Sequence, residues 1–177
     1  MRIYYNNTVP FDIIKILKNA RNVELVHIDN NHTWEGLFWR FYVQDDKTVD
    51  RYIIRDLDCR LSKNDKACVD EWIESNKPIH LMRTCNSHNI EIMGGLWGAI
   101  RNQLNINMIE SIKIFNDNAP TIKKGPDQSF LREIVWPLIK GNCLVHGLDF
   151  HYNSGEVKDF IYGINSRHDL NTIKTYK

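Results

Sequence analysis

The stretch Asp50-Arg51-Tyr52-Ile53-Ile54-Arg55-Asp56-Leu57-Asp58 contains a short apolar run with charged residues on both sides. A run of this length is typical of a buried strand, and the flanking charges place the end of that strand at Asp56. Two carboxylates, Asp56 and Asp58, then stand where the strand ends. In open α/β sheets, ligands bind beyond the carboxyl ends of the strands. The stretch therefore predicts a central strand and a candidate binding site next to it.

The residues before this strand predict a β-α-β unit. Arg2–Tyr5 is a short β-rich run, and residues 23–28 alternate in the way that strands do. Between them, Pro10 suits the first turn of a helix that reaches about Ala20. A β-α-β order is typical of a parallel strand pair.

The residues after the central strand continue the alternation of helices and strands. Ser62 and Asp65 resemble a capping pair for a helix that ends near Ser75, with Leu61, Cys68 and Trp72 facing the core. The remaining expectations are an aromatic helix over 34–42, a strand over 79–82, a glycine-rich bend over 93–98, a helix over 106–115, a helix from the N-cap Asp127 through 139 that is kinked near Pro137, a strand over 143–146 and a loop from 148 onward. The predicted fold is α/β with a mostly parallel sheet and flanking helices, as one domain over residues 1–177.

Composition narrows the possible partners. The hydrophobic share is 42% and the net charge is +1, so the chain has enough apolar residues for a core and no excess charge that favours nucleic acid. No apolar run is long enough to span a membrane or to form a signal peptide. The four cysteines contain no C-x-x-C pair, which fits free thiols in a reducing compartment. We therefore expect a cytoplasmic protein with no membrane span.

The Asp56-Leu57-Asp58 triplet is the best candidate for a metal site. Two carboxylates at i and i+2 on an extended turn can share one hard cation, and Mg²⁺ or Mn²⁺ keeps its other positions for phosphate and water. The alternative is a solvated strand end, with Arg55 or Arg60 pairing with the acids. Spacing alone does not separate the two interpretations.

Several blocks of the chain resemble, in register, a family of bacterial and viral glycosyltransferases of the GT-A type. The blocks are Glu35-Gly36-Leu37-Phe38-Trp39-Arg40-Phe41, Arg55-Asp56-Leu57-Asp58-Cys59-Arg60-Leu61-Ser62, Glu71-Trp72, His80-Leu81-Met82-Arg83, Gly94-Gly95-Leu96-Trp97-Gly98, Asp127-Gln128-Ser129-Phe130-Leu131 and His146.

This resemblance implies a fold and an activity. The fold would be GT-A-like (a nucleotide-diphospho-sugar transferase fold), and Asp56 and Asp58 would bind Mn²⁺ or Mg²⁺ together with the donor's pyrophosphate. The partners would be a nucleotide-sugar donor and an acceptor, which is a glycan, lipid or protein. The chain departs from the family at His146-Gly147, where His-Asp is usual, and after Arg83. It also begins just before the second strand of the family pattern, so the usual first strand is expected to be lacking.

Four further residues have two interpretations each. Arg55 and Arg83 are phosphate or sugar contacts, or they are ion-pair partners within the fold. His146 is a third metal ligand or a core histidine. Asp127 is a base that deprotonates the acceptor hydroxyl, or only a helix cap. Two rival functions are a degenerate, non-catalytic binding module for nucleotide sugars or carbohydrates and a metal-dependent phosphohydrolase.

Overall fold

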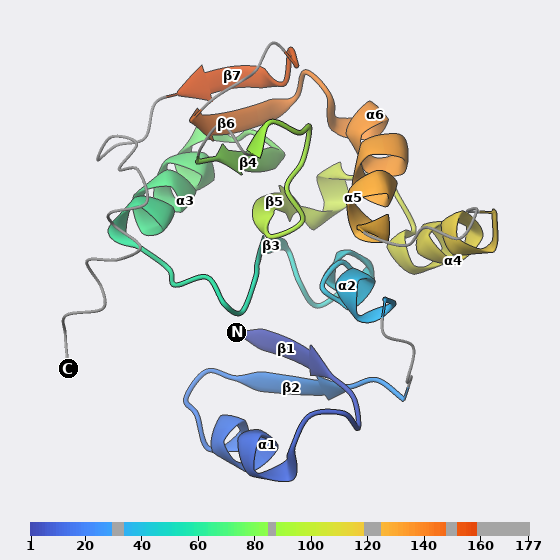
Figure 1. The fold of residues 1–177 in the computed structure, drawn as a ribbon. Coiled ribbons are helices and arrows are strands. Elements are labelled where there is room, and N and C mark those ends of the chain that lie inside the picture. The colour runs from blue at the N-terminus through green and yellow to red at the C-terminus, as the bar shows by residue number, and fades with distance from the viewer. Residues whose placement is uncertain (30–33, 85–87, 119–124, 148–151, 159–177) are drawn as a thin grey trace.

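The computed structural model of the chain describes residues 1–29, 34–84, 88–118, 125–147 and 152–158 (Figure 1). The strands are β1 (Arg2–Tyr5), β2 (Glu24–His27), β3 (Arg51–Arg55), β4 (Ile79–Arg83), β5 (Leu96–Ile100), β6 (Cys143–Gly147) and β7 (Gly155–Lys158). The helices are α1 (Phe11–Lys18), α2 (Gly36–Trp39), α3 (Lys63–Ser75), α4 (Met108–Asn118), α5 (Pro126–Phe130) and α6 (Trp136–Ile139). Short 3-10 turns cover Tyr42–Asp45 and Arg101–Gln103, and a π turn covers Leu131–Val135.

The strands form two sheets. β1 and β2 are a parallel pair, as the β-α-β pattern predicts, and the other five strands have the order β3-β5-β4-β6-β7. β5 runs antiparallel to both of its neighbours, whereas β4, β6 and β7 are parallel. The α/β class is confirmed. The mostly parallel sheet is not, because half of the neighbouring pairs in the larger sheet are antiparallel.

Strand β5 occupies the second half of the segment for which the sequence predicts only a bend. The turn is limited to the residues before it, where the Leu96 amide donates to the Met93 carbonyl at 3.1 Å. Gly98 lies opposite Ile53, and a Cβ atom at Gly98 would lie 2.6 Å from the Tyr52 carbonyl oxygen. Glycine therefore permits close pairing of β5 with β3. Because glycine weakens the interior of a strand, the same residue is the reason that the sequence did not predict this strand.

An aromatic cluster fills the core on one side of the larger sheet. Phe38, Phe41, Trp97 and Phe130 are almost completely buried, with ring centroids 5.8 to 6.4 Å apart for the contacting pairs. Figure 1 shows α4, α5 and α6 on this side of the sheet and α3 on the other. Burial of so many rings stabilises the position of α2 and α5 against the sheet.

Helix α3 begins with the predicted capping box. The Ser62 hydroxyl accepts from the Asp65 amide at 3.1 Å, and the Asp65 carboxylate accepts from the Ser62 amide at 3.1 Å. Cys68 and Trp72 are buried, as expected. The prediction for Leu61 is wrong, because this residue precedes the cap, outside the helix, and is 61% exposed.

The segment 126–139 is helical throughout, but not in the predicted way. Gly125, with a left-handed φ of 66°, is the N-cap, and Asp127 lies inside the first turn, so Asp127 is not the cap. The π turn precedes Pro137, whose ring would clash with the carbonyl four residues earlier in a regular helix. The loop predicted from 148 onward is also wrong in part, since β7 pairs with β6. None of the helices in the described ranges is long and apolar enough to cross a membrane.

Candidate functional site

A tight turn after β3 brings the predicted carboxylates together. The Cys59 amide donates to the Asp56 carbonyl at 3.1 Å, so the chain reverses over four residues. One ligand atom from each of Asp56, Asp58 and Cys59 lies within 4.8 Å of the others, and the side chain of Asp56 is 44% exposed. Burial and the two neighbouring carboxylates raise the pKa of the Cys59 thiol, which keeps it protonated. The two carboxylates are therefore the stronger ligands for a hard cation.

Arg40, at the end of α2, joins two of the predicted site residues. Its guanidinium bonds the Asp56 carboxylate through Nη1 and the Asp127 carboxylate through Nη2, the latter at 2.5 Å. The Nε atom donates to the Leu37 carbonyl at 3.0 Å, which aims the guanidinium. The Asp127 side chain is only 5% exposed. Arg40 thus compensates a buried carboxylate and links it to the exposed turn.

Two glycines pack directly against these side chains. A Cβ atom at Gly95 would overlap the Asp56 carboxylate, and one at Gly94 would lie 2.7 Å from Arg40 Nη2 and 3.0 Å from Asp127 Oδ2. Gln128 closes the same side, because its amide, in the orientation that satisfies both groups, donates to the Ile92 carbonyl at 3.1 Å and accepts from the Gly94 amide at 2.8 Å. The structure therefore unites the D-x-D, glycine and Asp-Gln blocks in one site.

The charges of this site favour a cation. Asp56, Asp58 and Asp127 contribute three negative charges, and Arg40 offsets one of them. The remaining negative charge is of the sign that a divalent cation would offset, and Arg40 would compete with such an ion for Asp56.

Arg55 points toward α3 instead of the carboxylate turn. It bonds Asp65 at 3.2 Å and the Ile54 carbonyl at 2.8 Å, and its side chain is 9% exposed. Burial lowers the pKa of the guanidinium, although Asp65 opposes this shift. These contacts match the ion-pair interpretation, and a phosphate contact by Arg55 stays a prediction.

Arg83 is buried, and its guanidinium forms hydrogen bonds with groups of two loops. It donates to the Ile90 carbonyl at 3.1 Å, the Glu91 carbonyl at 2.6 Å and the Ser154 hydroxyl at 3.0 Å, and it lies over the Tyr152 ring. With an exposed fraction of 1%, it offers little surface to a ligand in this conformation. A phosphate or sugar contact by Arg83 stays a prediction.

His146 lies in a separate polar network on β6. Its Nε2 atom bonds Glu71 at 2.9 Å, its Nδ1 atom bonds His80 Nε2 at 2.9 Å, and Lys158 bonds the other Glu71 oxygen. Among the described residues, the carboxylate group near Asp56 does not include His146. Both ring nitrogens already have partners, so the structure gives no support to the metal-ligand interpretation.

The network assigns the proton positions on the two imidazoles. A carboxylate only accepts, so His146 Nε2 carries hydrogen, and in the neutral tautomer of His146 the Nδ1 atom accepts from His80 Nε2. His80 Nδ1 is then a buried acceptor without a partner among the described residues, and the ring stacks on Trp72. Burial, together with His146 and Arg55, lowers the pKa of His80 to about 2.

A groove between β1 and β3 adjoins the carboxylate turn. We call it the β1–β3 groove; it is a cavity of about 590 Å³ that is lined by Met1, Arg2, Ile3, Tyr4, Gly36, Leu37, Trp39, Arg40, Val43, Arg51, Tyr52, Ile53, Ile54, Arg55, Asp56, Leu57 and Leu61. Arg40 and Asp56 belong both to this groove and to the site.

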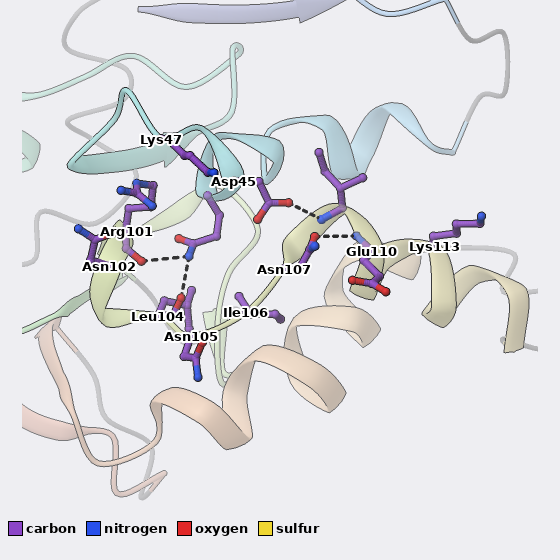
Figure 2. Close-up of a pocket in the computed structure, with 12 residues that line it drawn as sticks. Asp45, Lys47, Arg101, Asn102, Leu104, Asn105, Ile106, Asn107, Glu110 and Lys113 are labelled. Atoms are coloured by element: carbon purple, nitrogen blue, oxygen red, sulfur yellow. Dashed lines mark hydrogen bonds between the residues drawn. The ribbon is translucent and has the colours of Figure 1, made fainter.

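A second depression, of about 810 Å³, shares no lining residue with the groove (Figure 2). Several of its polar side chains have structural partners. Asp45 accepts from the amides of Met108 and Ile109 at 2.9 and 2.7 Å, and Asn107 accepts from the Glu110 amide at 3.1 Å, so both residues cap α4. Gln44 donates to the Leu104 carbonyl at 2.7 Å. We therefore regard this depression as a capping region.

The chain matches no protein-family model, and no curated protein or solved structure is significantly similar to it. The resemblance to glycosyltransferases therefore depends on the sequence blocks alone.

Sequence reasoning missed the role of Arg40. The residue lies inside the aromatic block at 35–41, where a single cation among apolar side chains was a usable signal. Its two partners are far away in the sequence, so the signal did not identify them. Gln128 was also missed as a contact of the glycine turn.

The buried His80 predicts a pH-dependent stability. In the unfolded chain His80 takes up a proton near the ordinary pKa of about 6.5, whereas in the folded chain it does so only near 2. The free energy of unfolding is therefore highest above about pH 6.5 and falls as the pH is lowered below that value. The free energy of unfolding, measured with urea, should be ~2 kcal/mol lower at about pH 5 than at about pH 7, and this loss should be smaller in His80→Gln. The exposed His27→Gln variant is the matched control and should keep the wild-type loss. Equal losses in all three proteins would contradict this assignment.

The contact between Gly95 and Asp56 predicts that a methyl group added at position 95 destabilises the protein. Gly95→Ala should lower the free energy of unfolding by about 1–3 kcal/mol, because the new Cβ forces the Asp56 carboxylate or the turn to move. Gly36→Ala is the matched control, since its Cβ would lie 3.7 Å from the Trp39 ring and alanine favours the helix. Urea unfolding of both variants measures the difference, and a neutral Gly95→Ala would show that the glycine is not needed there.

Proposed function

We propose that this chain is a metal-dependent glycosyltransferase with a GT-A-like fold, which moves a sugar from a nucleoside-diphosphate sugar to an acceptor hydroxyl. The observation that carries the proposal is the exposed carboxylate pair Asp56 and Asp58 at the end of β3, joined through Arg40 to the buried Asp127. A turn with two carboxylates leaves the remaining coordination positions of a cation free for phosphate oxygens.

The residues fit Mn²⁺ or Mg²⁺. Asp56 and Asp58 supply the hard oxygen ligands that these ions prefer, and the bound ion supplies Lewis acidity that takes up the charge of the departing nucleoside diphosphate. Arg40 must yield its contact with Asp56 if that carboxylate turns toward the ion. The guanidinium then lies beside the same turn, where it can donate to a phosphate oxygen.

Asp127 is the residue of the site to which we assign the role of base toward the acceptor hydroxyl. Its carboxylate bonds Arg40, and Gly94 packs closely against it, so an acceptor hydroxyl must displace part of this cover to reach the carboxylate. In the proposed transfer, the acceptor oxygen forms a bond to the anomeric carbon, the bond from that carbon to the diphosphate oxygen breaks, and the hydroxyl proton moves to Asp127.

The second candidate function is a non-catalytic module that binds nucleotide sugars or carbohydrates. It is favoured by the Arg40 bridge, which engages both Asp56 and Asp127 at the same time. Incubation with a panel of nucleotide sugars and Mn²⁺ separates the two candidates. Release of nucleotide from one donor supports the enzyme, whereas binding of metal without donor preference or turnover supports the module.

The metal and a nucleoside diphosphate should stabilise the protein together. Mn²⁺ plus a nucleoside diphosphate should raise the Tm more than either ligand alone, because the two carboxylates and the phosphates share one ion. Asp58→Asn should lose most of this joint shift, and Asp70→Asn, on the exposed side of α3, should keep it. Equal shifts in the wild-type and Asp58→Asn proteins would contradict the metal site.

Replacement of Asp127 should separate binding from turnover. Asp127→Asn should keep the joint stabilisation by Mn²⁺ and nucleoside diphosphate, because the residue acts on the acceptor and the amide oxygen can still accept from Arg40. Nucleotide release from the donor should fall by about a hundredfold or more. Glu133→Gln, at an exposed position of the same helical segment, should retain wild-type turnover. An unchanged rate in Asp127→Asn would remove this residue from the mechanism.

A further inference from the structure

The contacts of the Arg40 guanidinium differ in how easily they can open. Nε donates to the Leu37 carbonyl at 3.0 Å, and the face of the group lies over the Phe41 ring, with Cζ 5.4 Å from the ring centroid. Nη2 bonds Asp127 at 2.5 Å, and Nη1 bonds Asp56. Neighbours in its own segment therefore fix the guanidinium on two sides, and each of its terminal nitrogens holds a carboxylate.

The bond to Asp127 is the protected one. The Asp127 side chain is 5% exposed, and Gly94 packs so closely here that a Cβ atom at this position would lie 2.7 Å from Nη2 of Arg40. If this bond opened, a buried charge would be left without a partner, which is a costly state. We expect the Arg40–Asp127 bond to persist when a cation binds at the turn.

The bond to Asp56 is the one that can exchange. The Asp56 side chain is 44% exposed at the turn after β3, so water or a cation can reach this carboxylate. A carboxylate oxygen of Asp58 lies within 4.8 Å of one of Asp56. A divalent cation that is shared by these two carboxylates therefore meets Arg40 as a competitor at Asp56.

Opening this bond leaves a charged donor beside the same turn. Nε and Nη2 of Arg40 keep their acceptors, so the guanidinium stays in place, while the N–H of Nη1 loses its acceptor. A charged donor without an acceptor costs free energy, and water compensates only in part because the Arg40 side chain is 22% exposed. A phosphate oxygen next to the cation can accept this hydrogen bond. The metal alone therefore incurs a cost that the metal together with a diphosphate avoids.

We propose that Arg40 is an internal cation that occupies Asp56 in the free protein and makes metal binding depend on a diphosphate. Binding of Mn²⁺ or Mg²⁺ at Asp56 and Asp58 displaces Nη1, and a diphosphate oxygen replaces Asp56 as its acceptor. Because Nη2 stays on Asp127, the proposed base keeps its position while both ligands bind. The inference rests on the proposed metal site, and it assigns to Arg40 the cooperativity between metal and diphosphate.

Replacement of Arg40 by glutamine should change two affinities in opposite directions. In Arg40→Gln, Mn²⁺ alone should bind about tenfold more tightly, because the competitor at Asp56 is absent. Uridine diphosphate, titrated in excess Mn²⁺, should bind about tenfold more weakly, because the charged donor to the phosphate is absent. Calorimetry measures both dissociation constants. A residue that only supports the fold would weaken both affinities when it is replaced.

Two controls separate these effects from changes in net charge and in folding. Arg132→Gln removes the same charge from an exposed ion pair with Glu133, in the helical segment that follows Asp127, so both constants should stay within about twofold of the wild-type values. Arg40→Gln leaves Asp127 without its cation, which can prevent folding. In that case the double variant Arg40→Gln/Asp127→Asn is compared with Asp127→Asn, and the same two opposite shifts are expected.

The outcomes distinguish the role of Arg40 from the proposed function. If Asp58→Asn abolishes Mn²⁺ binding but Arg40→Gln leaves it unchanged or weaker, the role of Arg40 is overturned and the metal site stands. An unchanged or tighter affinity of Arg40→Gln for uridine diphosphate would likewise overturn it. If Asp58→Asn does not reduce Mn²⁺ binding, or if neither the wild type nor Arg40→Gln binds Mn²⁺ with or without uridine diphosphate, the metal site and this inference both fail.

Discussion

The bridge from Arg40 to Asp56 and Asp127 is the interaction on which the site depends. It connects the end of α2, the turn after β3 and the first turn of α5, and it compensates a carboxylate that is almost completely buried. Removing one partner of a buried pair leaves an uncompensated charge, at a cost of about 3–5 kcal/mol. The bridge explains why a guanidinium stands inside an otherwise aromatic block: the rings of Phe38 and Phe41 hold the backbone while the cation reaches the acids.

The glycine turn before β5 follows from the same constraint. With Arg40, Asp56 and Asp127 close together, the chain that covers them has no room for side chains at Gly94 and Gly95. Gly98 then lets β5 pair closely with β3, so one glycine-rich stretch serves both the site and the sheet. A hydrophobic core and a polar site thus meet at the end of β3. The proposed cation would be shielded from water on the core side and open to solvent on the other side.

The histidine network and Arg83 hold the opposite part of the sheet. His80, His146 and Glu71 connect β4, β6 and α3, while Arg83 ties β4 to the loop before Gly94 and to Ser154. Both groups have the residue types of a catalytic site, yet their partners are protein groups. Their contribution is to fix the strands beside the site. The β1–β3 groove lies at the other edge, where β3 has no strand beyond it in the described ranges.

The sequence by itself determined the features that depend on neighbouring residues. The capping box of α3 and the β-α-β order of the first elements follow from local patterns, and the structure has both. The strand predicted before Asp56 is present as β3, but it ends at Arg55 and lies at the edge of its sheet instead of the centre. Tertiary structure decided the direction of β5, the pairing of β7, the exposure of Leu61 and the partners of Arg40, Arg83 and His146. These features require contacts between residues far apart in the chain. Residue type shows that such a group needs a partner, but only packing in three dimensions decides which partner comes within reach.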